Sequence, residues 1–204
     1  MEAGIAEPLL AFALIMVYIW KLRVTHPSFW LFPVAFIAGS HVARRERART
    51  LGFELRNFGK CVRDFGPLLI GMVLAMWGAG LVFGSIRPLG PGAAFLAFAI
   101  YVPWGLFQQY LLNAYFLKRF EMSLSRQWAA ILAAALFGVV HSPNWFLMVV
   151  TPVGALGAIW VYRRYGNLYF PGLAHAALGF TLFMVVPDSV THHLRIGPGW
   201  YTGQ

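Results

Sequence analysis

Seven long apolar runs recur along this chain, and they constrain its fold more than any other feature. They are bounded by charges, prolines or polar turns and cover about residues 8–20, 28–40, 66–83, 93–117, 128–140, 145–162 and 168–186. A helix needs about 20 mainly apolar residues to cross the hydrocarbon core of a bilayer. Because 59% of the residues are hydrophobic and only 11% are charged, an ordinary soluble domain is excluded. We therefore predict an all-α fold, a polytopic helical membrane bundle of about seven transmembrane helices.

The chain is expected to form a single integral membrane domain over residues 1–204, with a short polar tail at residues 187–204. No linker, low-complexity tract or internal repeat interrupts the apolar runs. The first run has acidic rather than basic residues in its N-terminal flank, so it is interpreted as a retained helix and not as a signal peptide. Several runs are shorter than a full span, which leaves six or eight helices as alternatives.

The net charge of +9 predicts the orientation of the helices rather than a nucleic-acid partner, which we do not expect. If the N-terminus is cytoplasmic and seven spans alternate, four basic residues fall outside: Lys21, Arg23, Arg87 and Arg195. The other twelve then fall inside: Arg44, Arg45, Arg47, Arg49, Arg56, Lys60, Arg63, Lys118, Arg119, Arg126, Arg163 and Arg164. This excess favours a multi-pass protein with a cytoplasmic N-terminus, and we expect the cytoplasmic membrane of a bacterium.

The basic segment at residues 41–65 has two interpretations. It is either a plain cytoplasmic loop that follows the positive-inside bias, or a surface that lies on anionic lipid. In the second case each basic residue adds about 1 kcal/mol of attraction.

Few side chains within the apolar runs are able to do chemistry, and none of the seven carboxylates lies inside a run. The only embedded ionisable groups are His141 and His175, while His26, His41, His192 and His193 are expected to be solvated in loops or the tail. The neutral polar residues near them are Gln108, Gln109, Asn113 and Asn144. Residues four apart share one face of a helix, so Gln109 lies with Asn113, Phe137 with His141, and His175 with Gly179. We therefore predict a polar cavity where three helices converge.

The order and spacing of these residues resemble the CPBP family, which contains the CAAX prenyl endopeptidases and the bacteriocin-processing or Abi proteins. The family carries a Glu-Glu-x-x-x-Arg helix, then Phe-x-x-x-His, then His-x-x-x-Asn or Asp. Here the first element is Gln108-Gln109 with Asn113, the second is Phe137 to His141, and the third keeps His175 but has Gly179. The resemblance covers about residues 49–183. It implies a CAAX-peptidase-like bundle in which Gln108, Gln109, Asn113, Phe137, His141, Asn144, His175 and Gly179 are the catalytic or cavity-lining positions.

The resemblance also implies that the catalytic glutamate pair is replaced by glutamine. An amide has no proton-accepting group in the working pH range, so Gln108 is able to orient water but not to deprotonate it. Two histidines and neutral amides are also a poor set of ligands for a divalent ion, and Cys61 is the only cysteine. We therefore expect no metal and no other cofactor.

Two classes of function follow. The first is a non-catalytic binding or scaffold protein, a pseudoenzyme, whose partners are membrane lipids, other membrane-protein subunits, or a prenyl, lipid or peptide-tail ligand. The second is an atypical intramembrane endopeptidase that uses His141 and His175, whose ordinary pKa suits a base. On their own, the amides are also explained as hydrogen-bonding links between helices, worth about 0.6 to 2 kcal/mol. Close helix packing is expected at two small-residue pairs, Gly80 with Gly84 and Gly172 with Ala176.

Overall fold

The computed structural model describes residues 3–202, so the first two and last two residues of the expected domain lie outside it. The described residues form helices and turns, and no strand occurs among them. The α-helices are α1 (Ala3–Val17), α2 (Leu31–Ala43), α3 (Phe58–Val82), α4 (Pro91–Gln109), α5 (Lys118–Glu121), α6 (Arg126–Val139), α7 (Trp145–Tyr165), α8 (Tyr169–Val185), α9 (Asp188–Thr191) and α10 (Gly199–Thr202). The π-helices are η1 (Tyr18–Leu22) and η4 (Tyr110–Leu117), and the 3-10 helices are η2 (Pro27–Trp30), η3 (Ala48–Leu51) and η5 (His192–Leu194).

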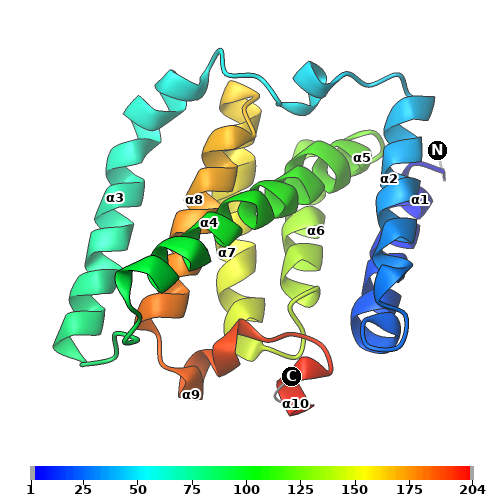
Figure 1. Cartoon of the computed structure of the whole chain (residues 1–204). Helices are drawn as coiled ribbons and strands as arrows, with labels where there is room; N and C mark the ends of the chain where they lie inside the picture. The colour runs from blue at the N-terminus through cyan, green and yellow to red at the C-terminus, as the bar shows by residue number, and fades with distance from the viewer. Residues whose placement is uncertain (1–2, 203–204) are drawn as a thin grey trace.

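Each predicted apolar run forms a helix, and the long helices run back and forth between two edges of the molecule (Figure 1). Four of the described helices are long and apolar enough to cross a membrane: Gly4–Leu22, Phe58–Val82, Pro91–Glu121 and Trp145–Tyr165. A fifth span is possible where Tyr169–Val185 meets Asp188–Leu194 at a bend of 118°. The helices Pro27–Ala43 and Arg126–Val139 are shorter. At 1.5 Å per residue, the 14 residues of α6 reach only about 21 Å. The all-helical membrane fold is confirmed, with four or five spans by length where about seven were predicted.

The longest described helix runs obliquely through the bundle and joins α4, η4 and α5 (Figure 1). Its middle section is the π-helix η4, in which six consecutive residues, from Leu112 to Leu117, are buried. Segments α6 and α7 pack against η4, and α1 packs against α5. Because π-helical turns are rare and often occur at functional sites, this buried section is a candidate position for a site.

Helices α4 and α8 approach closely because small residues face each other where they cross. A Cβ atom added at Gly105 would lie 2.7 Å from the carbonyl oxygen of Gly172 and 2.9 Å from the backbone nitrogen of Ala176. One added at Gly172 would lie 2.9 Å from the Cα atom of Leu106. Two of the predicted packing residues therefore lie at this crossing, together with Gly105. Such contact between backbones brings the polar residues of α4 within reach of α8.

The two residues of the other predicted packing pair, Gly80 and Gly84, have different surroundings. A Cβ atom at Gly80 would lie 2.9 Å from the Cβ atom of Val185, so Gly80 packs against α8. Gly84 has no neighbour within 4 Å of such an atom, and its φ is +61°. The prediction of a packing contact at Gly84 is therefore wrong, because this residue supplies the left-handed backbone that follows α3.

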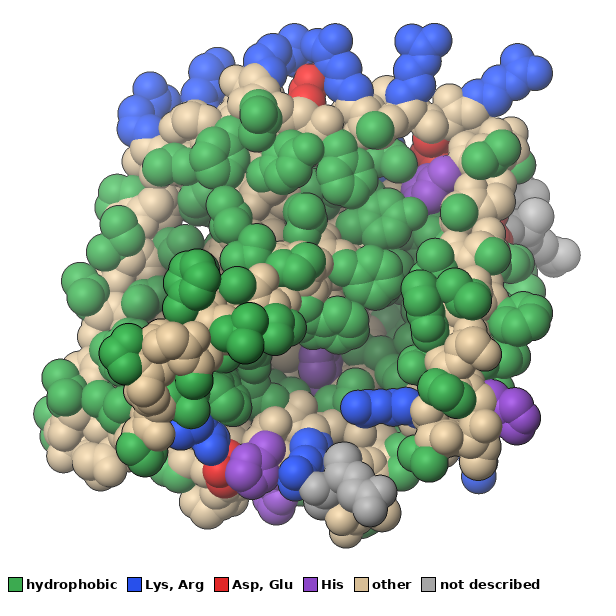
Figure 2. All heavy atoms as spheres, viewed as in Figure 1, with side chains coloured by type: hydrophobic (Ala, Val, Ile, Leu, Met, Phe, Trp, Pro, Cys, Tyr) green, Lys and Arg blue, Asp and Glu red, His purple; other side chains and the backbone are tan. Residues whose placement is uncertain are grey.

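Basic side chains gather along one edge of the molecule, above a face that is mainly hydrophobic (Figure 2). This edge includes the exposed residues Arg45, Arg47, Arg49, Arg56 and Lys60, between α2 and the first turn of α3. The first turns of α1 reach the same edge, since Glu7 contacts Arg44 there. The cytoplasmic location of this edge stays a prediction.

Candidate functional site

Three of the predicted site residues form one hydrogen-bonded chain between α4, η4 and α8. The side-chain amide of Asn113 donates to Oε1 of Gln109 at 2.8 Å. The amide Nε2 of Gln109 then donates to Nδ1 of His175 at 3.3 Å. Gln109 is 2% exposed and Asn113 is fully buried, so these amides are shielded from solvent and lipid. Because Nδ1 of His175 accepts a hydrogen bond, a neutral His175 carries its proton on Nε2.

His141 lies in the turn after α6, and its Nδ1 atom is a hydrogen-bond donor, whereas Nδ1 of His175 is an acceptor. Its Nδ1 donates to the carbonyl oxygen of Phe137 at 2.6 Å, so the proton of a neutral His141 is on Nδ1 and its Nε2 has a free lone pair. The ring of Phe137 lies between the two imidazoles, 5.2 Å from His141 and 5.9 Å from His175 between ring centroids. The structure therefore brings Gln109, Asn113, Phe137, His141 and His175 together.

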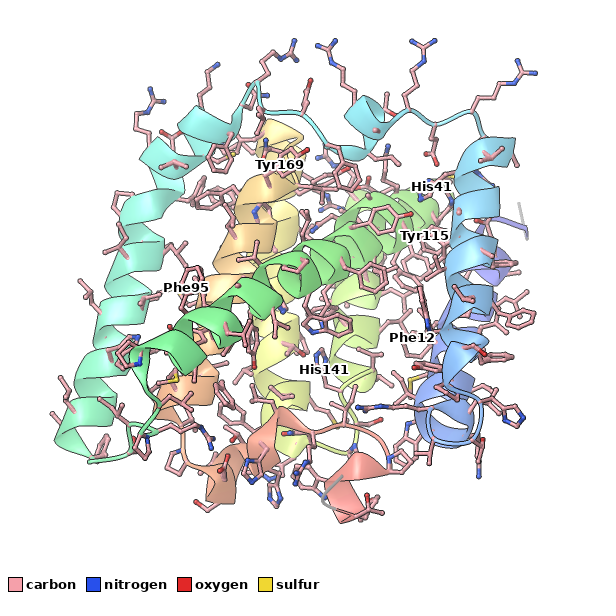
Figure 3. All side chains as sticks on the ribbon, in the orientation of Figure 1. Phe12, His41, Phe95, Tyr115, His141 and Tyr169 are labelled. Atoms are coloured by element: carbon pink, nitrogen blue, oxygen red, sulfur yellow. The ribbon has the colours of Figure 1, made fainter. Side chains whose placement is uncertain are left out.

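The face shown in Figure 2 is hollowed between α4 and the α1–α2 pair, and a histidine lies at the floor of the hollow. Figure 3 labels His141 at this place. Two buried oxygens of the central helix, Oε1 of Gln108 and Oδ1 of Asn113, have no hydrogen-bond partner within the described residues. Buried acceptors without donors cost free energy, so a ligand or water that offers N–H or O–H groups would be favoured there.

Two other predicted residues have different surroundings. The side chain of Asn144 caps α7, with Oδ1 accepting from the backbone N–H of Leu147 and Nδ2 donating to the carbonyl oxygens of Thr191 and Arg195. Its hydrogen-bonding capacity is therefore used in holding the C-terminal segment against α7. At Gly179, a Cβ atom would lie 3.2 Å from the ring of Tyr101. An asparagine or aspartate at this position would require Tyr101 to move.

The residues at the site do not fit a transition-metal ion. No group of three or more histidine, cysteine or acidic side chains able to hold a metal occurs among the described residues. The imidazole Nδ1 atoms are both engaged, one by Gln109 and one by Phe137. Only two Nε2 atoms remain, one of them protonated in the neutral ring, whereas a catalytic zinc ion takes three protein ligands.

Sequence reasoning missed Thr151 of α7, whose hydroxyl lies 3.4 Å from Nδ1 of His141 and donates to the carbonyl oxygen of Leu147 at 2.7 Å. A polar residue in an apolar run was the available signal. This signal did not identify Thr151, because the sequence does not show which residues of different helices lie close together in space.

The larger omission is a buried charged cluster around Arg119, a residue that is 1% exposed. Arg119 donates to Glu7 of α1 at 3.2 Å and to Glu46 of the α2–α3 loop at 2.6 Å. It also donates to the hydroxyl of Ser40, which itself hydrogen-bonds to Glu7. The cluster ties the α1–α2 pair to the central helix near the basic edge, where Figure 3 labels His41 and Tyr115.

His41 belongs to this cluster, so the expectation that it is solvated is wrong. It is 7% exposed, and its Nδ1 donates to Glu46 at 2.6 Å. Burial alone would raise the pKa of Glu46, but hydrogen bonds from Arg119 and His41 outweigh it and lower the pKa to about 2. Glu46 therefore stays ionised at every physiological pH.

The central part of the chain is similar to one protein-family model. The family model described as type II CAAX prenyl endopeptidase Rce1-like matches residues 88–181, a little under half of the chain. No curated protein and no solved structure matches the chain. The matched segment includes α4 to α7 and most of α8, and with them the glutamine pair and both embedded histidines. The family match confirms the resemblance predicted from the spacing of these residues, and with the long apolar helices it identifies an integral membrane protein.

Proposed function

We propose that this chain, whose residues 88–181 match the Rce1-like model of type II CAAX prenyl endopeptidases, binds a ligand in the membrane without cleaving it. The observation that carries the proposal is the neutral chain of hydrogen bonds from Asn113 through Gln109 to His175. Amides occupy the positions where the resemblance places carboxylates.

Proton transfer is the step that these amides do not support. A general base contributes about 10²- to 10⁴-fold to a hydrolysis, and a glutamine amide does not accept a proton at neutral pH. Gln109 instead donates to His175 and leaves its proton on Nε2, so the Nε2 atom of this ring is a donor. A site with this polarity holds a ligand by hydrogen bonds but lacks the carboxylate that would activate water.

The ligand that suits this site combines apolar bulk with a few hydrogen-bonding groups. The surroundings of the two histidines are aromatic and aliphatic, while Gln108 and Asn113 each leave one oxygen without a donor. A prenyl or acyl chain with a polar head, or the tail of a membrane protein, meets both requirements. Binding such a tail would make the chain a subunit of a larger membrane complex.

One observation favours a second function, an atypical endopeptidase. The Nε2 atom of His141 has a free lone pair at the floor of the hollow, since its Nδ1 donates to Phe137. A neutral imidazole of this kind is a competent general base. In this case His141 would activate water and the N–H of His175 would polarise a carbonyl group.

The experiment that separates the two functions reconstitutes the full chain in lipid vesicles with a library of prenylated and unprenylated peptides. We expect no cleavage by the wild type and binding that weakens in His141→Ala and His175→Ala. Cleavage by the wild type that disappears in both variants would replace the binding function by the endopeptidase.

Two matched variants restore a carboxylate at neighbouring positions. Gln108→Glu places it where the amide oxygen already has no partner, so we expect a loss of stability of several kcal/mol or uptake of a proton. Gln109→Glu should be better tolerated, because Asn113 and a protonated His175 are both able to donate to it. We expect neither variant to cleave peptides, and thermal unfolding in detergent measures their order of stability.

A further inference from the structure

An open apolar groove of about 490 Å³ lies against α4, and none of its lining residues belongs to the histidine site. Its lining residues come from two parts of the chain. They are Ala48, Leu51 and Phe53 of the α2–α3 connection, and Pro103, Leu106, Phe107 and Tyr110 of the central helix. Three of its rings follow one another closely, with 6.5 Å between the centroids of Phe107 and Tyr110 and 5.9 Å between those of Tyr110 and Phe53. The lining of the groove is therefore apolar, and its shape accepts a hydrocarbon chain.

The loop side of the groove is held rigidly. Lys118 donates to the carbonyl oxygen of Thr50 at 2.7 Å, and the hydroxyl of Tyr162 donates to that of Leu51 at 3.2 Å. Gly52 has a φ of +95° and lies so close to Tyr162 that an added Cβ atom would be 2.8 Å from its ring. Because α5 and α7 both hold this connection, the groove exists before any ligand enters it.

Exposed positive charge lies next to the lining of the groove along the chain. Arg47 directly precedes the lining residue Ala48, Arg45 lies two positions before Arg47, and both arginines are exposed. Their neighbours are neutralised, since Arg44 pairs with Glu7 at 2.5 Å and Arg49 with Glu54 at 2.7 Å. Within the described residues Arg45 and Arg47 make no ion pair, so their guanidinium groups are available to an anion at the rim of an apolar groove. They belong to the row of basic side chains above the hydrophobic face in Figure 2.

We propose that this groove binds one anionic phospholipid of the adjoining leaflet. An acyl chain lies between the central helix and the Ala48–Phe53 side, and the phosphate group contacts Arg45 and Arg47. The charge pattern selects this occupant over a zwitterionic lipid, because a guanidinium pairs with a phosphate by charge-assisted hydrogen bonds and is repelled by a choline ammonium group. The neutral lining of the groove excludes a ligand with charge along its length.

The test uses the full chain, purified in detergent and stripped of lipid, with dioleoyl phosphatidylglycerol and dioleoyl phosphatidylcholine as probes in native mass spectrometry. We expect phosphatidylglycerol to bind at least tenfold more tightly than phosphatidylcholine. The variant Arg45→Asn with Arg47→Gln should weaken phosphatidylglycerol binding about 30-fold, since each charge near a lipid surface contributes about fivefold and the two factors multiply. Asparagine suits the φ of +53° at position 45.

Two further variants make the result decisive. Ala48→Trp places a bulky ring in the groove from an exposed position and should abolish the preference for phosphatidylglycerol while the charges remain. Lys21→Gln with Arg23→Gln removes two exposed charges from the opposite edge and should leave binding unchanged. Equal binding of the two lipids, or a preference that survives the Arg45 and Arg47 changes or Ala48→Trp, would overturn the proposal. Lipid retention is measured without peptide or turnover, so its failure leaves the proposed function unaffected.

Discussion

At the scale of single residues, Arg119 shows how far a side chain's role depends on its partners. In sequence it is one of a dozen basic residues at the predicted cytoplasmic side. In the structure its guanidinium is buried and bonded to carboxylates from two other segments, Glu7 and Glu46. A buried guanidinium requires such partners because its removal from water costs several kcal/mol. The carboxylates, for the same reason, are not free to serve the histidine site.

The first residue-scale prediction concerns Glu46, whose pKa falls from 4.5 to about 2 in the folded protein. An acid with a lowered pKa stabilises the fold fully above its unfolded pKa, and this stabilisation is lost as the pH falls towards the folded pKa. Glu46→Gln should therefore lower the free energy of unfolding by about 1–3 kcal/mol at pH 7. The difference from wild type should shrink between pH 4.5 and pH 2 in a denaturation series, whereas a difference that does not change with pH would contradict the assignment.

At the scale of elements, the central helix and α8 position the site together. The π-helix η4 places Asn113 within hydrogen-bonding distance of Gln109. The crossing at Gly105 and Gly172 brings His175 within hydrogen-bonding distance of Gln109. Any increase in the distance between α4 and α8 would break the 3.3 Å contact between Gln109 and His175. The small residues are thus as important to the site as its polar side chains.

A matched pair of glycine substitutions tests this dependence. Gly105→Ala places a methyl group 2.7 Å from a carbonyl oxygen of α8, and since backbone does not move aside easily we expect a cost of about 1–3 kcal/mol. Gly157→Ala, in the middle of α7 with nothing within 4 Å, should instead stabilise by about 0.5–1 kcal/mol. Unfolding in mixed micelles measures both, and equal effects would show that the crossing is not tightly packed.

At the scale of the whole molecule, the distribution of basic residues agrees with the path of the chain between the two edges. The described start of α1, the α2–α3 connection and α5 are linked near the basic edge through Glu7, Glu46 and Arg119. The α1–η2 turn and the segment after α8 lie at the opposite edge (Figure 1). The positive-inside bias then predicts that the basic edge faces the cytoplasm.

Labelling of single cysteines tests this orientation in a Cys61→Ala background, where the buried native thiol is absent. We expect a membrane-impermeant maleimide to label Ser28→Cys in intact cells, because this exposed residue follows the α1–η2 turn. Arg56→Cys, exposed at the basic edge, should react only after the membrane is permeabilised. The reverse pattern would place the N-terminus outside.

The class of the protein, its helices and the order of its site residues were all determined by local sequence. In lipid a backbone must satisfy its hydrogen bonds within each segment, so an apolar run of sufficient length forms a helix wherever it packs. The match at residues 88–181 agrees with the spacing of Gln108, His141 and His175. Spacing alone also predicted that Gln109 and Asn113 share a face.

Tertiary structure alone decided which of these residues touch. His175 lies 66 positions from Gln109, and Glu46 lies 73 positions from Arg119, so both pairings depend on how separate helices cross. That crossing is set by close contacts at Gly105 and Gly172, which carry no signal of their partners in sequence. His41 became a buried residue for the same reason, because the carboxylates that surround it arrive with other segments of the chain.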